Sequence, residues 1–160
     1  MLQLEIVGVR VELPSKQPIV LLKESEGERY LPIWIGAVEA TAIAFAQEGV
    51  VTARPMTHDL MRDVLQALDI TVTKVTVDSL ADGVFFATLH FSNGSEVSAR
   101  PSDAIALAMR MDVPVFGAET VLDEAGITVP EDGEKDEEGE VEKFREFLDN
   151  ISADDFNTGS

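Results

Sequence analysis

The sequence predicts a mixed α+β fold, in which a mostly antiparallel sheet packs against three to four helices. Short runs of alternating apolar and polar residues are separated by turn residues, which is typical of antiparallel strands. Between these runs lie stretches with the apolar spacing of amphipathic helices. Of the 160 residues, 45% are hydrophobic, so that one domain can bury a core without the help of disulfides.

The N-terminal part of the chain predicts an antiparallel meander of three strands. These strands cover residues 2–13, 19–22 and 30–35. On the first strand the alternation marks the expected core residues Leu4, Ile6, Val9 and Val11. Turn-forming residues at 14–18 and around Gly27 separate the strands. Pro32 in the third strand indicates a sheet edge or a bulge, because proline has no N–H to donate to a neighbouring strand.

Two helices are expected next. Gly36 leads into an alanine-rich helix at residues 37–47, and Gly49 ends it. The second helix follows Thr57, whose hydroxyl group makes it the expected N-cap. The apolar side chains of this helix recur at helical spacing and form one stripe. The stripe consists of Leu60, Met61, Val64, Leu65 and Leu68.

The second half of the chain again predicts strands followed by a helix. Strands are expected at residues 70–77, 84–91, 95–99 and 113–116, and helices at residues 103–111 and 119–125. The pair Asn93-Gly94 is a strong signal for a two-residue hairpin turn, and Lys74 interrupts the alternation of its strand. On the first of these helices Ile105, Ala108 and Met109 share one face.

The tripeptide Ala-Arg-Pro occurs twice, at residues 53–55 and 99–101, each time just before a helix start that contains an Asp. Proline disfavours the helical conformation for the residue before it, so each Arg is expected to be extended just outside a helix. Both helices then end in an Asp and a β-branched residue, at Asp69-Ile70 and Asp112-Val113. An internal duplication is one interpretation of this repeat.

Acidic residues are concentrated at the C-terminal end of the chain. The net charge is −18, and residues 131–160, with 12 acidic and 3 basic side chains, contribute half of it. We expect a domain at 1–130, an acidic linker at 131–140, an amphipathic helix at 141–151 and a disordered tail at 152–160. This last helix either packs onto its own domain or is captured by a partner protein or a second subunit.

The sequence also excludes several classes of function. Without cysteines there is no thiolate nucleophile, cysteine-ligated zinc or disulfide. The chain has no membrane-spanning apolar stretch and no signal-peptide features at its N-terminus, so we expect a cytoplasmic protein without membrane association. It lacks the glycine-rich nucleotide loops, the His-Glu-x-x-His zinc motif and the Gly-x-Ser-x-Gly motif. The acidic charge argues against tight duplex binding, yet it is compatible with a small or single-stranded phosphate substrate.

The polar residues around the two Ala-Arg-Pro tripeptides form the candidate site. Carboxylates together with a histidine can hold Mg²⁺ or Mn²⁺, and arginines can clamp a phosphate. Asp59 and Asp63 lie one turn apart on the same helix face. The expected catalytic residues are His58, Asp59 and Asp103, the expected metal ligands are Asp59, Asp63 and Asp103, and the expected substrate contacts are Arg54, Arg100 and Ser102. No organic cofactor is expected.

Each of these residues also has a structural interpretation. Carboxylates in the first turn of a helix stabilise its N-terminus, and the two arginines can pair with them to fix the preceding loops. Ser102 can act as an N-cap, and His58 can be an exposed residue without a role. His90 stands in a strand between two apolar residues, and we expect no catalytic role for it.

Three segments resemble the bifunctional nuclease family of bacteria and plants. They are residues 30–36, with the sequence Tyr-Leu-Pro-Ile-Trp-Ile-Gly, residues 54–60 and residues 98–104. The resemblance spans residues 2–130, and the acidic linker with residues 141–148 is similar to the tail of actinobacterial members. It implies a compact α/β domain that hydrolyses RNA and DNA. It implies no particular set of catalytic residues.

Two functions stand as hypotheses. The first is a metal-assisted nuclease that hydrolyses phosphodiester bonds of RNA or single-stranded DNA and forms a homo-oligomer. The second is a non-enzymatic regulatory or interaction module, in which both Ala-Arg-Pro corners are structural. In that case the helix at 141–151 binds a protein partner through Phe144, Phe147 and Leu148.

Overall fold

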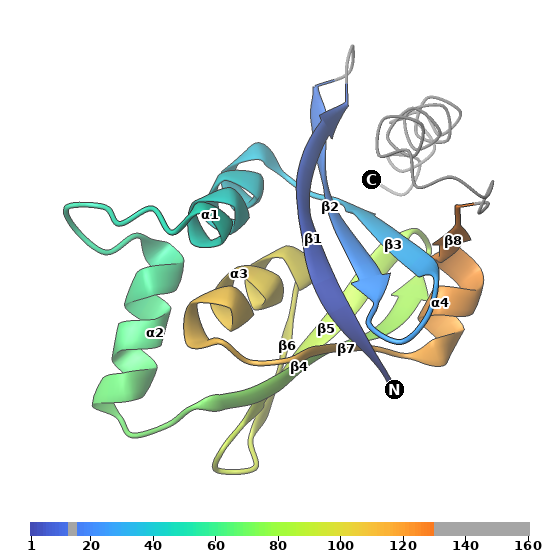
Figure 1. Cartoon of the computed structure of the whole chain (residues 1–160). Coiled ribbons are helices and arrows are strands. Elements are labelled where there is room, and N and C mark those ends of the chain that lie inside the picture. The colour runs from blue at the N-terminus through green and yellow to red at the C-terminus, as the bar shows by residue number, and fades with distance from the viewer. Residues whose placement is uncertain (13–15, 130–160) are drawn as a thin grey trace.

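The computed structural model describes residues 1–12 and 16–129, which form one eight-stranded sheet and four helices (Figure 1). The strands are β1 (Leu2–Glu12), β2 (Gln17–Glu24), β3 (Arg29–Trp34), β4 (Val72–Ala81), β5 (Val84–Phe91), β6 (Glu96–Ala99), β7 (Val115–Gly117) and β8 (Ile127–Thr128). The helices are α1 (Ala37–Glu48), α2 (Thr57–Ala67), α3 (Pro101–Met111) and α4 (Glu119–Ala125). The predicted mixed α+β class with a mostly antiparallel sheet is confirmed. The expectations for residues 131–160 lie outside the described residues.

Two antiparallel meanders make up most of the sheet, whose strand order is β6-β5-β4-β7-β1-β2-β3-β8. Strand β7 joins the meanders, because it pairs antiparallel to β1 and parallel to β4. Each meander is followed by a helix, α1 after β3 and α3 after β6. The architecture therefore repeats, but the Ala-Arg-Pro tripeptides do not mark the repeat, since they precede α2 and α3.

The two Ala-Arg-Pro corners start their helices in different ways. Pro101 is the first residue of α3 and Arg100 is its N-cap, so this Arg stands directly at the helix terminus. Helix α2 has Met56 as its N-cap, and the prediction of Thr57 was wrong. Asp59 explains the difference, because its Oδ2 accepts a hydrogen bond from the Met56 N–H over 3.1 Å.

The ends of the two helices match more closely than their starts. Asp69 and Asp112 both have a φ of 56°, which is the left-handed conformation that ends a helix. Asp tolerates this conformation better than most residues, because its short polar side chain can form local hydrogen bonds. The Asp followed by a β-branched residue, which the sequence shows twice, is thus a helix stop that leads into a strand.

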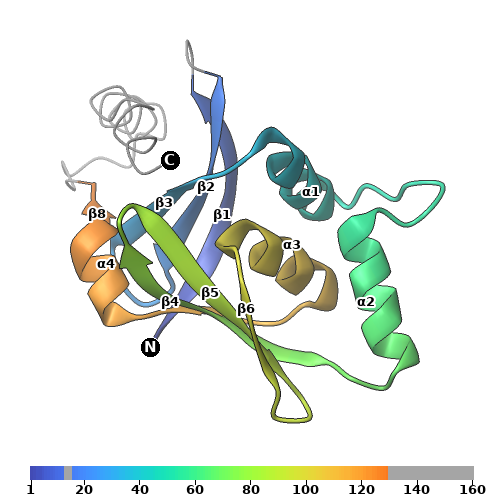
Figure 2. The ribbon, with the colours of Figure 1, turned by 180° about the vertical axis from the view of Figure 1, so that it is seen from behind.

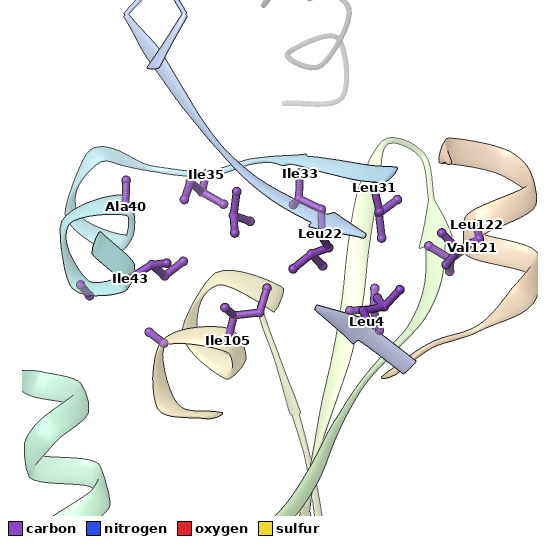
Figure 3. Close-up of a cluster of buried hydrophobic side chains, with 14 residues drawn as sticks. Leu4, Leu22, Leu31, Ile33, Ile35, Ala40, Ile43, Ile105, Val121 and Leu122 are labelled. Carbon is purple, nitrogen blue, oxygen red and sulfur yellow. The ribbon is translucent and has the colours of Figure 1, made fainter. Parts of the chain in front are cut away.

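The main core lies between the sheet and helices α1, α3 and α4 (Figure 3). Its residues come from both meanders and from these three helices, and they include Leu4, Leu22, Leu31, Ile33, Ile43, Ile105, Val121 and Leu122. Each fully buried aliphatic side chain of this kind stabilises the fold by about 1.5–3 kcal/mol. Of the core residues predicted on the first strand, Leu4 is buried and Ile6 and Val9 pack against the core. Val11 is 60% exposed, so its prediction was wrong.

Helix α2 lies outside α1 and α3, at the end of the molecule opposite α4 (Figures 1 and 2). An apolar stripe on a helix ordinarily faces the core. Here only Leu65 of the predicted stripe packs against buried residues. The other four stripe residues, Leu60, Met61, Val64 and Leu68, are 37–63% exposed. The one buried residue of α2 is His58.

Candidate functional site

The N-terminal turns of α2 and α3 meet through a histidine and a carboxylate. His58 Nε2 lies 3.0 Å from Asp103 Oδ1. His58 is only 8% exposed, so the view of it as an exposed residue was wrong. It is buried because α2 turns the side that carries His58 toward α3, where Asp103 supplies the polar partner that a buried imidazole needs.

Arg100 extends this pair toward α1. Its Nε and Nη2 both lie 2.8 Å from Asp103 Oδ2, and Nη2 also lies 2.8 Å from Glu39 Oε1. The hydrogen bond to Asp103, and then the one to Glu39, raises the pKa of Arg100 above its ordinary value. Glu39, Arg100, Asp103 and His58 therefore form one continuous polar chain across α1, α3 and α2, which we call the polar chain.

A second ion pair holds the same three helices together from the other end of α3. Arg110 Nε donates to Asp59 Oδ1 over 2.7 Å, while its Nη2 donates to the Ala42 carbonyl of α1 over 3.0 Å. The Arg110 side chain is only 6% exposed. Burial by itself would raise the pKa of Asp59, but the hydrogen bonds from Arg110 and the Met56 N–H outweigh it and hold that pKa below its ordinary value.

The contacts of Asp103 define what the polar chain can do chemically. A carboxylate only accepts hydrogen bonds, so the His58 Nε2 that faces it carries the proton. In the neutral ring Nδ1 then holds the lone pair and can accept a proton from a substrate or a water. The other Asp103 oxygen is fixed by Arg100, which keeps the carboxylate in place. This is a histidine oriented by a carboxylate, one of the arrangements that can support general base catalysis.

Four predicted site residues lie outside the polar chain, and one of them is Asp59, which pairs with Arg110. Arg54 is exposed in the loop between α1 and α2, where its own carbonyl accepts a 2.6 Å hydrogen bond from Thr52. Asp63 pairs with the adjacent Arg62 over 3.1 Å. Ser102 is buried in the first turn of α3 and is 6% exposed. Among residues 1–12 and 16–129, no three His, Asp or Glu side chains gather in a group that could hold a metal ion.

Sequence reasoning missed two residues, Glu39 and Arg110. Glu39 could have been suspected, because it occupies the first turn of the helix that follows the segment at 30–36. Arg110 is the one cation within α3, a helix with seven buried residues. A charged residue on a largely buried helix needs a partner, so the position of Arg110 in the sequence already indicated a polar contact.

His90 takes part in a different network. Its Nε2 lies 2.9 Å from Thr76 Oγ1, and its Nδ1 lies 3.3 Å from Glu96 Oε1. Val75 and Val77, the neighbours of Thr76, are buried in the cores, so Thr76 and His90 face the opposite side of the sheet. The second histidine of the chain is thus separate from the polar chain.

Comparison with known proteins identifies similar sequences. Residues 20–130 match the bifunctional nuclease domain. An uncharacterized protein of Mycobacterium tuberculosis strain H37Rv is 48% identical over 96% of this chain and 97% of its own length. Bifunctional nuclease 2 of Arabidopsis thaliana is 30% identical over 64% of this chain and 34% of its own length. For bifunctional nuclease 1 of the same plant the identity is 28%, over 74% of this chain and 39% of that protein.

Proposed function

Because the chain belongs to the bifunctional nuclease domain family, we propose that it hydrolyses phosphodiester bonds in RNA or single-stranded DNA at the polar chain. The names of the plant relatives support nucleic acid as the substrate class. The single observation that supports the location is the 3.0 Å contact between His58 and Asp103, with Arg100 on the other carboxylate oxygen.

In this proposal His58 acts as a general base and Asp103 orients it. Nδ1 of His58 takes a proton from the attacking water as the water oxygen forms a bond to phosphorus. The bond from phosphorus to the leaving oxygen breaks, and the proton passes to that oxygen. Asp103 stabilises the imidazolium that forms between these two steps, because its charge lies 3.0 Å from Nε2.

The arginines supply phosphate contacts. Arg100 is 65% exposed although it is bonded to two carboxylates, so part of its guanidinium group is accessible to a substrate. Arg54 stands in the exposed loop before α2. Residues 1–130 hold 18 acidic and 9 basic side chains, so that electrostatic attraction for long duplexes is weak. The proposal therefore favours short or single-stranded substrates.

Metal assistance belongs to the proposal as a separate claim. Asp59, Asp63 and Asp103 each pair with an arginine, and as arranged they do not fit a ready-made Mg²⁺ or Mn²⁺ centre. Mg²⁺ commonly binds one or two carboxylates together with substrate phosphates, and this is the mode the claim requires. Cleavage rates with added Mg²⁺, added Mn²⁺ and excess EDTA test the claim directly.

The nuclease proposal is tested with the two histidines of the chain as a matched pair. Purified wild type should cleave labelled RNA or single-stranded DNA, and His58→Gln should reduce the rate by about 10²–10⁴-fold. His90→Gln, on the opposite side of the sheet, should cleave like the wild type. Equal rates for wild type and His58→Gln, with both proteins folded by circular dichroism, would overturn the assignment.

A further inference from the structure

Helix α2 is amphipathic in the reverse sense to that of an ordinary surface helix. Its polar side faces the domain, where His58 is buried and Asp59 pairs with the buried Arg110. Its apolar side faces outward. Together with the cap residues at its two ends, this side forms what we call the α2 apolar face, which consists of Met56, Leu60, Met61, Val64 and Leu68.

The exposure of this face is too large for scattered surface residues. Its five members are 37–63% exposed, and all of them lie on α2 or at its caps. Contiguous exposed apolar patches on soluble proteins mark interaction sites. Folding leaves these side chains in water because α2 attaches to α1 and α3 mainly through its polar side, and of its apolar stripe only Leu65 packs against buried residues.

We propose that the α2 apolar face binds a second copy of this chain. Charge supports this occupant. Residues 50–68 contain two arginines and two aspartates and are neutral, whereas residues 1–130 as a whole carry a net charge of −9. Two copies of an acidic protein repel each other least where they are locally neutral. A charged partner such as a nucleic acid would gain nothing from this surface, whereas an identical apolar surface would.

The α2 apolar face supplies about half of the area that a stable dimer buries. Complete burial of its five side chains would remove on the order of 400 Å² of surface from each copy, against roughly 800 Å² per partner in a stable interface. The flanking groups of α2 would add the remainder. Arg62 and Asp63 flank the face as a pair, so a two-fold axis presents one cation and one anion from each copy to the other.

The proposed interface lies on the side of α2 away from His58, which is buried against α3. The dimer itself does not depend on nuclease activity. The two proposals can therefore fail separately, because dimerisation is measured as a molecular mass and nuclease activity as a cleavage rate.

The mass in solution is the primary test, and sedimentation equilibrium on the full chain measures it. Wild type should have twice the 17.4 kDa chain mass, and Val64→Asp should reduce it to that of one chain while circular dichroism stays unchanged. Val84→Asp is the matched control, because Val84 is 50% exposed and Val64 is 48% exposed. It should remain a dimer. A monomeric wild type at 100 µM, roughly the weak end of specific association, would overturn the proposal.

Cross-linking locates the contact independently of any loss of folding. Since the chain has no cysteine, single variants Leu60→Cys, Val64→Cys and Leu68→Cys can form only intermolecular disulfides. At least one of them should give a disulfide-linked dimer on mild oxidation, because a two-fold axis places one position near its own copy. Val84→Cys should not. Two results would show that a second copy does not bind the α2 apolar face. One is a monomeric wild type in which α2 is protected from solvent, and the other is equal cross-linking of all four variants.

Discussion

His58 of α2 and Asp103 of α3 lie 3.0 Å apart, although 45 positions separate them in the sequence. The first Ala-Arg-Pro corner contributes the histidine and the second contributes the carboxylate and its arginine. The β4-β5-β6 meander lies between the two corners in the sequence, and it returns the chain to α1 and α2, where α3 begins. In our proposal the two corners therefore form one site together, and neither copy contains it alone.

Removal of the Arg110 guanidinium should destabilise the domain more than any other arginine substitution in α2 or α3. Arg110→Met leaves Asp59 without its partner and the Ala42 carbonyl without its donor. Breaking a largely buried ion pair costs about 3 kcal/mol. We expect a melting temperature lower by roughly 10 °C, measured by calorimetry. Arg54→Met should melt like the wild type, and equal losses in both variants would contradict the role of Arg110.

The pH dependence of stability should reflect Asp59. Its pKa is lowered in the folded state, so its contribution is fully present above the ordinary carboxyl value of 3.8 and is lost as the pH falls through the lowered pKa. Asp59→Asn should therefore reduce the free energy of unfolding at pH 7. The gap between this variant and the wild type should shrink below pH 3.8, as measured by urea unfolding at several pH values.

The control for this series is Asp63→Asn on the same helix. Its carboxylate is 42% exposed and pairs only with the adjacent Arg62 among the described residues. Surface pairs of this kind contribute about 0–1 kcal/mol, so the free energy of unfolding should barely change. A pH profile of Asp59→Asn parallel to that of the wild type would show that the Asp59 carboxylate is not the group that titrates.

The two corner arginines should separate substrate binding from stability. Arg54→Gln should leave the melting temperature unchanged and raise KM for RNA, because Arg54 is exposed and serves only the substrate in our proposal. Arg100→Gln should lower both the melting temperature and kcat, since Arg100 also holds Asp103 and Glu39. Steady-state kinetics and thermal melts on both variants measure this split. An unchanged KM for Arg54→Gln would remove it from the site.

The elements set by local sequence were predictable. The helix at 119–125 and the strand at 84–91 have the expected bounds, and the interruption at Lys74 is a register shift between β4 and β5. Turn chemistry and alternation act over a few residues, so one sequence reveals them. The pairing of β7 with both β1 and β4 joins distant segments, and no local pattern indicates it.

The sequence predicted several residues of the candidate site, but it predicted fewer of the contacts between them. His58, Arg100 and Asp103 were expected together, and they form the polar chain with Glu39, which was not expected. Asp59 and Asp63, one turn apart, pair with different arginines, because α2 turns Asp59 toward α3. The orientation of α2 was the decisive unknown. The apolar stripe predicts that this side of α2 faces the core, but the polar contact with Arg110 turns the opposite side of the helix toward the domain.

Chemical rescue of His58→Ala is the most direct test of the catalytic role of His58. The variant should lose about 10²–10⁴-fold in the cleavage rate of labelled RNA. Added imidazole should restore part of that rate, increasingly as the pH rises and more imidazole is neutral, because it replaces the missing base beside Asp103. Asp103→Ala should not be rescued by imidazole. A His58→Ala variant that cleaves RNA as fast as the wild type, without imidazole, would contradict the account.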